Sequence, residues 1–113
     1  MDWQGFLESA KANVGALATA TPGTVGGYQA LHAAGSKADL LGERTRELIC
    51  IAVAVTTRCN SCIANHVQKA IALGVTRGEI AEAVGVAVAM NAGAALSYAG
   101  RAMDAHAALT NAA

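Results

Sequence analysis

Apolar residues recur along the chain at helical spacing and are interrupted by short polar or glycine-containing segments, which predicts helices joined by short loops. No internal repeat, linker or shift in composition marks a boundary, so the 113 residues are expected to form a single domain, 1–113. The predicted fold is all-α. About six helices are expected, over about residues 2–20, 25–34, 42–55, 60–73 and 76–90, with a sixth that ends near residue 109.

Residues that favour helix ends support these boundaries. The Thr-Pro-Gly segment 21–23 is expected to stop the first helix, because proline cannot continue the hydrogen-bond ladder. Another break is expected at 35–37. Gly74 suits the left-handed position that follows a helix, and Thr76 with Glu79 has the Thr-x-x-Glu form of a capping box. One helix is therefore expected to end at Gly74 and the next to begin directly after it.

The apolar segment 48–55 is the one place where a strand competes with a helix. Its β-branched residues favour a strand. The charged segment 43–47 leads into it without glycine or proline, however, and together they make about 15 continuous residues. This length favours a buried helix.

Small side chains carry much of the apolar content. Hydrophobic residues make up 54% of the chain but aromatic residues only 4%, and a buried alanine stabilises a fold less than a buried leucine or phenylalanine. We therefore expect a thin core, supplemented by self-association. Small residues at every fourth position would also let another helix approach closely: Ala81, Gly85, Ala89, Gly93 and Ser97.

The charge pattern excludes several partners. Eight basic and eight acidic side chains give a net charge of zero, so the chain lacks the basic excess that binding to nucleic-acid phosphates requires. Segment 80–100 holds one charged residue, Glu82, but it is mostly alanine and glycine with Asn91 at its centre, which favours a buried helix over a membrane span. Segment 1–8 has no signal-peptide pattern. We expect a cytoplasmic protein that binds neither nucleic acid nor membrane.

The residues most suited to chemistry lie between positions 47 and 66. Cys59 and Cys62 form a C-x-x-C pair at an expected helix start, where free backbone N–H groups and the helix dipole favour a thiolate. Their i, i+3 spacing allows a disulfide. His66 follows one turn later and could accept a proton from Cys62. Glu47 begins an apolar helix face, so it needs a partner such as a histidine or thiol.

Other uses of the cysteines fit the sequence less well. A structural zinc site on Cys59, Cys62 and His66 would need a fourth ligand from elsewhere in the chain. Attachment of a c-type haem requires a histidine where Ile63 stands, and a thioredoxin fold requires βαβ units that the pattern lacks. The fourth zinc ligand could come only from these residues: Cys50, Glu47, His32 or His106.

The remaining candidate residues are expected to have structural or surface positions. Cys50 is expected to be a small buried hydrophobic residue. His32 and His106 have no motif around them, and we expect them to be surface or hydrogen-bonded histidines. Trp3, Phe6 and Leu7 are expected to contact the core or another subunit.

Segment 47–66 resembles the AhpD-like superfamily, the alkylhydroperoxidase branch of the carboxymuconolactone decarboxylase family. The shared pattern is a glutamate, a C-x-x-C twelve positions later, and a histidine four positions after the second cysteine, and this chain matches all four positions. The resemblance extends over about residues 40–90 and implies an all-α fold assembled as a trimer or hexamer. Some members have histidine or tyrosine where Asn60 and Ser61 stand. The decarboxylase branch lacks the cysteine pair, so decarboxylation is disfavoured.

The resemblance implies a thiol-dependent peroxidase, a peroxiredoxin-type oxidoreductase. In the implied cycle, Glu47 and His66 deprotonate Cys62, whose thiolate attacks a hydroperoxide and becomes a sulfenic acid. Cys59 then condenses with it to a disulfide, which a lipoyl group or a thioredoxin-like protein reduces. No cofactor or metal is implied. Two alternatives stay open: a redox-sensing or zinc-stabilised oligomeric module, and an enzyme of the family that acts on a substrate other than a peroxide.

Overall fold

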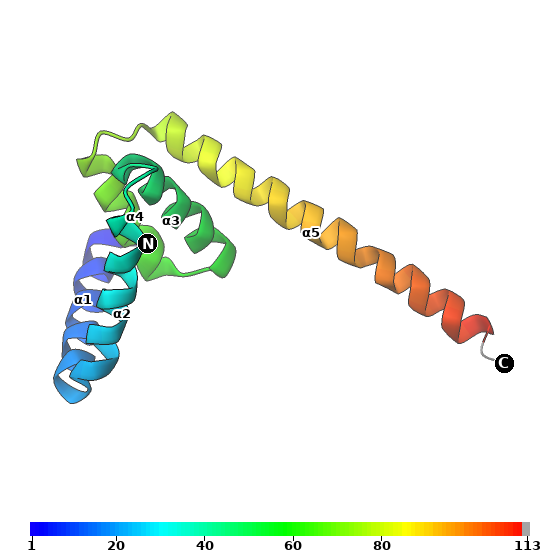
Figure 1. The fold of residues 1–113 in the computed structure, drawn as a ribbon, viewed down its shortest axis with the longest axis horizontal. Coiled ribbons are helices and arrows are strands. Elements are labelled where there is room, and N and C mark those ends of the chain that lie inside the picture. The colour runs from blue at the N-terminus through cyan, green and yellow to red at the C-terminus, as the bar shows by residue number, and fades with distance from the viewer. Residues whose placement is uncertain (112–113) are drawn as a thin grey trace.

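The computed structural model describes residues 1–111, which form five helices and no strand (Figure 1). The helices are α1 (Trp3–Ala20), α2 (Pro22–Lys37), α3 (Glu43–Thr57), α4 (Asn60–Ala72) and α5 (Arg77–Asn111). The all-α prediction is confirmed, and so is the helical interpretation of segment 48–55.

The prediction of two helices after residue 76 was wrong, because α5 is continuous over 35 residues. No proline lies within it, and alanine, the strongest helix former, surrounds its glycines closely enough to carry the helix through them. The predicted limits of α2 were also too narrow. Pro22 occupies the first turn of α2, where its missing N–H costs nothing, so α1 and α2 are separated by Thr21 alone. At the other end, the helix includes the expected break at 35–37.

The core lies among α3, α4 and the start of α5. Its centre is Ile51, which is 1% exposed, together with buried Ala70 and Val75. The guanidinium of Arg44 ties α3 to this end of α5 by donating to Glu79 Oε1 at 2.8 Å and to the carbonyl of Gly74 at 3.3 Å. Partly buried side chains surround the centre: Leu48, Val67, Leu73, Ile80 and Val84.

The turn between α4 and α5 forms as the sequence predicts. Gly74 has a φ of 79°, and the N–H groups of Gly74 and Val75 donate to the carbonyls of Ile71 and Ala70 at 3.0 and 2.9 Å. This pattern is a Schellman motif, which places Val75 against Ala70 in the core. The capping box then begins α5: the backbone N–H of Thr76 donates to Glu79 Oε1 at 2.9 Å, and that of Glu79 donates to Thr76 Oγ1 at 3.1 Å.

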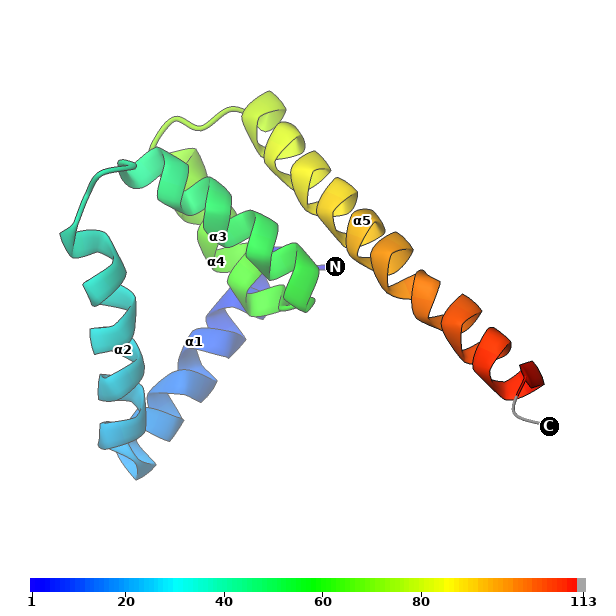
Figure 2. The same cartoon turned by 45° about the vertical axis from the view of Figure 1, so that its right-hand side comes forward.

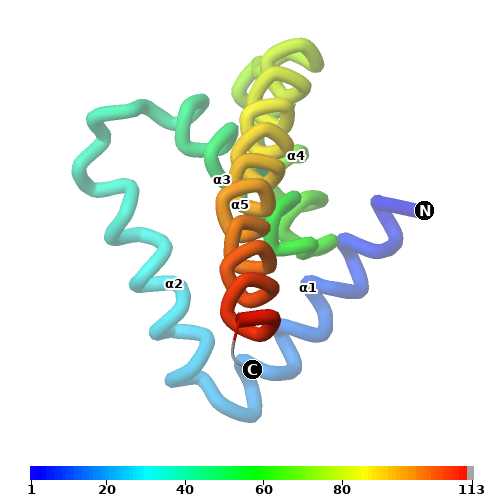
Figure 3. The backbone as a smooth tube through the Cα atoms, turned by 90° about the vertical axis from the view of Figure 1, so that its right-hand side faces the viewer, coloured from blue at the N-terminus to red at the C-terminus, as the bar shows by residue number. Residues whose placement is uncertain are grey.

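Helices α1 and α2 form a V that meets the rest of the protein through α1, which packs on α4 (Figures 2 and 3). Leu7 is the buried residue of α1, Phe6 is half-buried, and Trp3 is 43% exposed. Trp3 and Phe6 contact each other edge to face. The open side of the V faces α3 and α4 (Figure 2).

Helix α5 packs on α3 only along its first half and then projects from the molecule (Figure 1). The radius of gyration is 19.3 Å, whereas a compact chain of this length has about 13 Å. The face toward α3 holds buried Ala87, and Asn91 Nδ2 donates to Thr56 Oγ1 at 2.9 Å. The row of small residues from Ala81 to Ser97 is exposed.

Large apolar side chains are exposed along the projecting helix: Val86, Val88, Met90, Leu96, Tyr98, Met103 and Leu109. Among the described residues, α5 is long and apolar enough to cross a membrane by length and composition, and little of it is buried. The prediction that segment 80–100 is a buried helix was therefore wrong for the single chain, in which most of these residues are exposed.

Candidate active site

The turn between α3 and α4 places Cys59 at the start of α4. Helix α3 ends with Arg58 in the left-handed conformation, at a φ of 56°. The N–H groups of Arg58 and Cys59 donate to the carbonyls of Val55 and Ala54 at 3.2 and 3.0 Å. This turn reverses the chain within two residues, so that Cys59 is the N-cap of α4.

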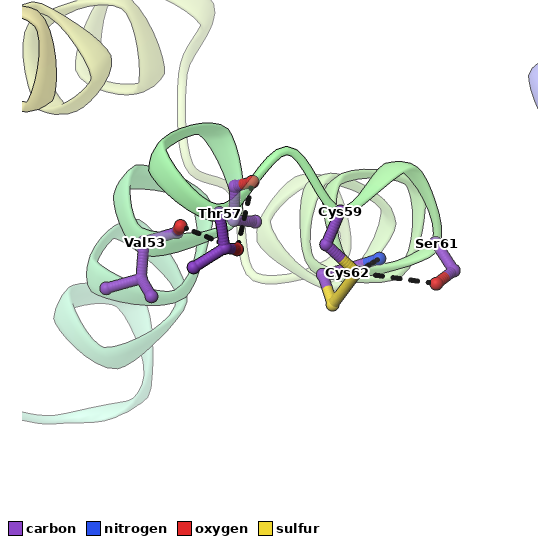
Figure 4. Close-up of a disulfide and its surroundings, with 6 residues drawn as sticks. Val53, Thr57, Cys59, Ser61 and Cys62 are labelled. Atoms are coloured by element: carbon purple, nitrogen blue, oxygen red, sulfur yellow. Dashed lines mark hydrogen bonds between the residues drawn. A yellow bond between two sulfur atoms is a disulfide. The ribbon is translucent and has the colours of Figure 1, made fainter.

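Cys59 and Cys62 form the disulfide that their spacing allows, with Cα atoms 5.2 Å apart (Figure 4). The backbone N–H of Cys62 donates to Cys59 Sγ at 3.3 Å, and the Ser61 hydroxyl lies 3.5 Å from the same sulfur. Both donors would also stabilise negative charge on Cys59 Sγ after reduction. The N-terminus of α4 can therefore stabilise Cys59 Sγ both in the disulfide and as a thiolate.

His66 and Glu47 form a buried pair across α3 and α4. His66 Nδ1 lies 2.6 Å from Glu47 Oε2, and the two side chains are 8% and 14% exposed. A carboxylate only accepts hydrogen bonds, so the neutral imidazole carries its proton on Nδ1 and keeps a lone pair on Nε2. The need of Glu47 for a partner, expected from the sequence, is met by His66. The pair can thus take up a proton at Nε2 while the carboxylate stabilises the resulting imidazolium.

A cavity of about 540 Å³ lies between the V of α1 and α2 and the start of α4. Cys62 and His66 both line it, so the second cysteine of the pair shares this space with the histidine. Its other walls are mainly apolar, with Lys11 as the charged residue. The apolar and aromatic lining comes from α1 and α2: Leu7, Val14, Leu17, Val25 and Tyr28.

Cys50 is a free thiol one turn after Glu47. It is half-buried, whereas the sequence predicted a buried residue. Its sulfur lies within 4.8 Å of ligand atoms of Glu47 and His66. Burial, and next the charge of Glu47, raises the pKa of the Cys50 thiol above its ordinary value, against a smaller lowering by Lys69 and Arg46. Cys50 is thus a protonated thiol at neutral pH and part of the same cluster.

A second cavity, of about 650 Å³, lies among α2, α3 and α4. Glu47 and Cys50 of α3 line it, and so does His32 of α2. Charged residues also line this space: Glu43, Arg46 and Lys69.

His32 is exposed, as the sequence predicted, but it also lies beside His66, which the sequence did not predict. Its ring centroid is 5.9 Å from that of His66 and 6.1 Å from that of Tyr28, so α2 adds an aromatic row to the site. The i, i+4 spacing of Tyr28 and His32 was a signal for a shared helix face. His106, in contrast, is exposed on the far half of α5 and takes no part in the cluster.

Comparison with known proteins places this chain in a family. The model of the carboxymuconolactone decarboxylase family matches residues 22–105. An uncharacterized protein of Haemophilus influenzae is 43% identical over 105 residues, which is 93% of each chain. An uncharacterized protein of the cox locus of Paracoccus denitrificans is 46% identical over 63 residues, 56% of this chain and 57% of the relative.

A solved structure shares the fold. The crystal structure of a protein from Methanobacterium thermoautotrophicum superposes with a TM-score of 0.70 and 32% sequence identity, over 75% of this chain and 96% of that one. These matches show that the chain belongs to the carboxymuconolactone decarboxylase family, which confirms the resemblance seen in the sequence.

Proposed function

We propose that the protein is a thiol-dependent peroxidase of the AhpD-like kind, with Glu47, Cys59, Cys62 and His66 as its catalytic residues. The observation that carries the proposal is the Cys59–Cys62 disulfide at the start of α4, one helical turn from a buried histidine paired with a carboxylate. A dithiol in this position is activated by the helix N-terminus and has a base beside it.

In the first half of the cycle, His66 Nε2 takes the proton of Cys62, and Glu47 stabilises the imidazolium. The thiolate attacks the terminal oxygen of a hydroperoxide ROOH and breaks the O–O bond. Cys62 becomes a sulfenic acid, and ROH leaves with the proton held by His66. Cys62 is the attacking residue because it shares the apolar cavity with His66, so that a bound peroxide would meet both side chains.

In the second half, the Cys59 thiolate attacks the sulfenic sulfur. The S–O bond breaks, the S–S bond forms, and the leaving hydroxide becomes water by taking up the proton that the Cys59 thiol released. A dithiol reductant, such as a lipoyl group or a thioredoxin-like protein, then reduces the disulfide by two exchange steps and is itself oxidised to a disulfide. The cycle needs no bound cofactor.

Thiol titration tests this function. The fully reduced chain has three cysteines, and one equivalent of an organic hydroperoxide should remove two titratable thiols and leave that of Cys50. The Cys59→Ser/Cys62→Ser double variant is the control and should keep its single thiol. Loss of the two thiols with continued peroxide consumption under a dithiol supply supports the enzyme. Disulfide formation without turnover would instead favour a redox-sensing module, and unchanged thiols would refute both.

We also propose that the protein works as a trimer or hexamer in the cytoplasm. The support is the exposed apolar surface of α5, which one copy of the chain leaves uncovered. Light scattering should give the mass of three or six chains, and the washed membrane fraction should lack the protein. Leu96→Lys on α5 should weaken assembly, whereas Asn111→Lys, at the end of the same helix, should leave it intact. A monomeric wild type would contradict this assembly.

A further inference from the structure

We propose that Glu47, Cys50 and His66 form a binding site for a borderline divalent cation of the zinc class, separate from the cysteine pair. One ligand atom from each residue lies within 4.8 Å of the other two. All three side chains are at least partly shielded from solvent. This site replaces the zinc arrangement considered from the sequence, which used Cys59 and Cys62, because those two sulfurs are bonded to each other.

The donor atoms favour zinc over magnesium or calcium. A thiolate, an imidazole nitrogen and a carboxylate oxygen are the ligands that zinc takes, whereas the harder cations prefer oxygen alone. Tetrahedral zinc with bonds of about 2.0 to 2.3 Å holds its ligand atoms roughly 3.3 to 3.8 Å apart. Ligand atoms within 4.8 Å of one another need to close by at most about 1 to 1.5 Å, and His66 Nδ1 and Glu47 Oε2, at 2.6 Å, need to move apart by less than that. Side-chain rotation can supply both movements.

The cavity over Glu47 and Cys50 gives a cation a route in and leaves room for a water as the fourth ligand. The charges that face this space leave a negative excess. Arg46 is already paired with Asp39 at 2.7 Å, and the other charged residues of the lining are Glu43, Glu47 and Lys69. This excess attracts a cation, and the Cys50 thiol gives up its proton when it binds the ion.

Binding at this site would compete with the proton relay. His66 hydrogen-bonds Glu47 directly, and a cation shared by both residues takes the place of that bond. The consequence for peroxidase turnover rests on the proposed function, but the binding itself depends only on the positions of the three side chains.

Cobalt(II) is the probe that tests the site, because thiolate coordination produces a charge-transfer absorption band and four-coordination produces intense d–d bands. The oxidised protein is used, so that the Cys59–Cys62 disulfide cannot contribute ligands. We expect one cobalt ion per chain with both spectral features, displaced by zinc. Cys50→Ser should abolish the charge-transfer band and weaken cobalt binding by at least about tenfold.

The Cys59→Ser/Cys62→Ser variant is the matched control and should bind cobalt with an unchanged spectrum. Far-ultraviolet circular dichroism checks that each variant is folded, and Cys50→Ala provides a second substitution at the same position. The proposal is overturned if the oxidised wild type binds no cobalt, or if the charge-transfer band survives in both Cys50 variants. Neither readout uses peroxide, so failure of the peroxidase proposal would leave this result unaffected.

Discussion

His66 Nδ1 lies 2.6 Å from Glu47 Oε2, and this buried contact joins residues 19 positions apart on two helices. The short distance and low exposure make it a strong polar interaction between α3 and α4. It holds the imidazole in one orientation and one tautomer, with Nε2 free to act as a base. In the proposed cycle, proton transfer from Cys62 therefore depends on Glu47, which need not contact the substrate.

Glu47→Gln should slow peroxide reduction. An amide oxygen can still accept from Nδ1, so the ring keeps its place, but the imidazolium loses its counter-charge. We expect the rate of sulfenic acid formation at neutral pH to fall about 100-fold, within the range that general base catalysis supplies. Stopped-flow measurement of thiol oxidation by an organic hydroperoxide checks this.

A matched control separates this effect from a general change in charge. Glu43→Gln removes an acid from the exposed first turn of α3 and should change the rate by less than about twofold. Equal rates for Glu47→Gln and the wild type would show that the pair has no part in proton transfer.

Arg58→Gly should stabilise the oxidised protein. Arg58 holds a φ of 56° at the end of α3, a conformation that costs a residue with a Cβ atom about 1–2 kcal/mol and costs glycine little. Part of the gain is lost to the greater freedom of glycine in the unfolded chain, so a net gain of about 1 kcal/mol is expected.

Urea denaturation measures the gain, and Ala52→Gly provides the control. Ala52 lies within α3, so glycine there should destabilise the protein by about 1 kcal/mol. A loss of stability in Arg58→Gly would mean that this side chain makes favourable interactions that outweigh its backbone conformation.

Ile51→Ala should destabilise the protein strongly, because it truncates the side chain at the centre of the core. Ile51 is 1% exposed at the centre of the cluster that joins α3, α4 and the start of α5. Truncation of such a buried isoleucine costs about 2–5 kcal/mol in the free energy of unfolding. Ile49→Ala, on the same helix but 47% exposed, should cost less than about 1 kcal/mol. Similar losses for the two variants would place the core elsewhere.

Glu79→Gln should reduce stability at neutral pH but not in acid. The backbone N–H of Thr76 donates to Glu79 Oε1 at 2.9 Å, and this bond, with those from the Thr76 hydroxyl and Arg44, lowers the pKa of the carboxyl. A lowered folded-state pKa adds stability above the ordinary glutamate pKa of about 4.3, and the gain is lost as pH falls through the lowered value. The difference in melting temperature between wild type and variant should therefore shrink toward zero in acid. A difference that stays constant with pH would rule out this ionic contribution.

Local signals in the sequence were enough for most helix ends. The Thr76–Glu79 capping box and Gly74 act within a few residues, and the structure has the predicted hydrogen bonds and positive φ at these positions. The length of α5 was not predictable in the same way, because alanine-rich sequence has no positive signal for continuing through Gly85 and Gly93. Pro22 was misread for a related reason: the residue that ends one helix is equally suited to begin the next.

The sequence indicated the main residues of the candidate site, but not most of the contacts among them. The C-x-x-C spacing anticipated the disulfide, because both sulfurs lie on one helix turn. The approach of Cys50 to His66, and of His32 to the same ring, depends on how α2, α3 and α4 pack. No local pattern encodes that packing.

The fate of the Cys62 sulfur after removal of Cys59 tests the proposed cycle most directly. Cys59→Ser is treated with one equivalent of organic hydroperoxide and a reagent that traps sulfenic acids, and the adduct is located by mass spectrometry of peptides. We expect one adduct per chain, on Cys62, with Cys50 unmodified. An unmodified Cys62, or an adduct on Cys50 alone, would contradict the proposed cycle.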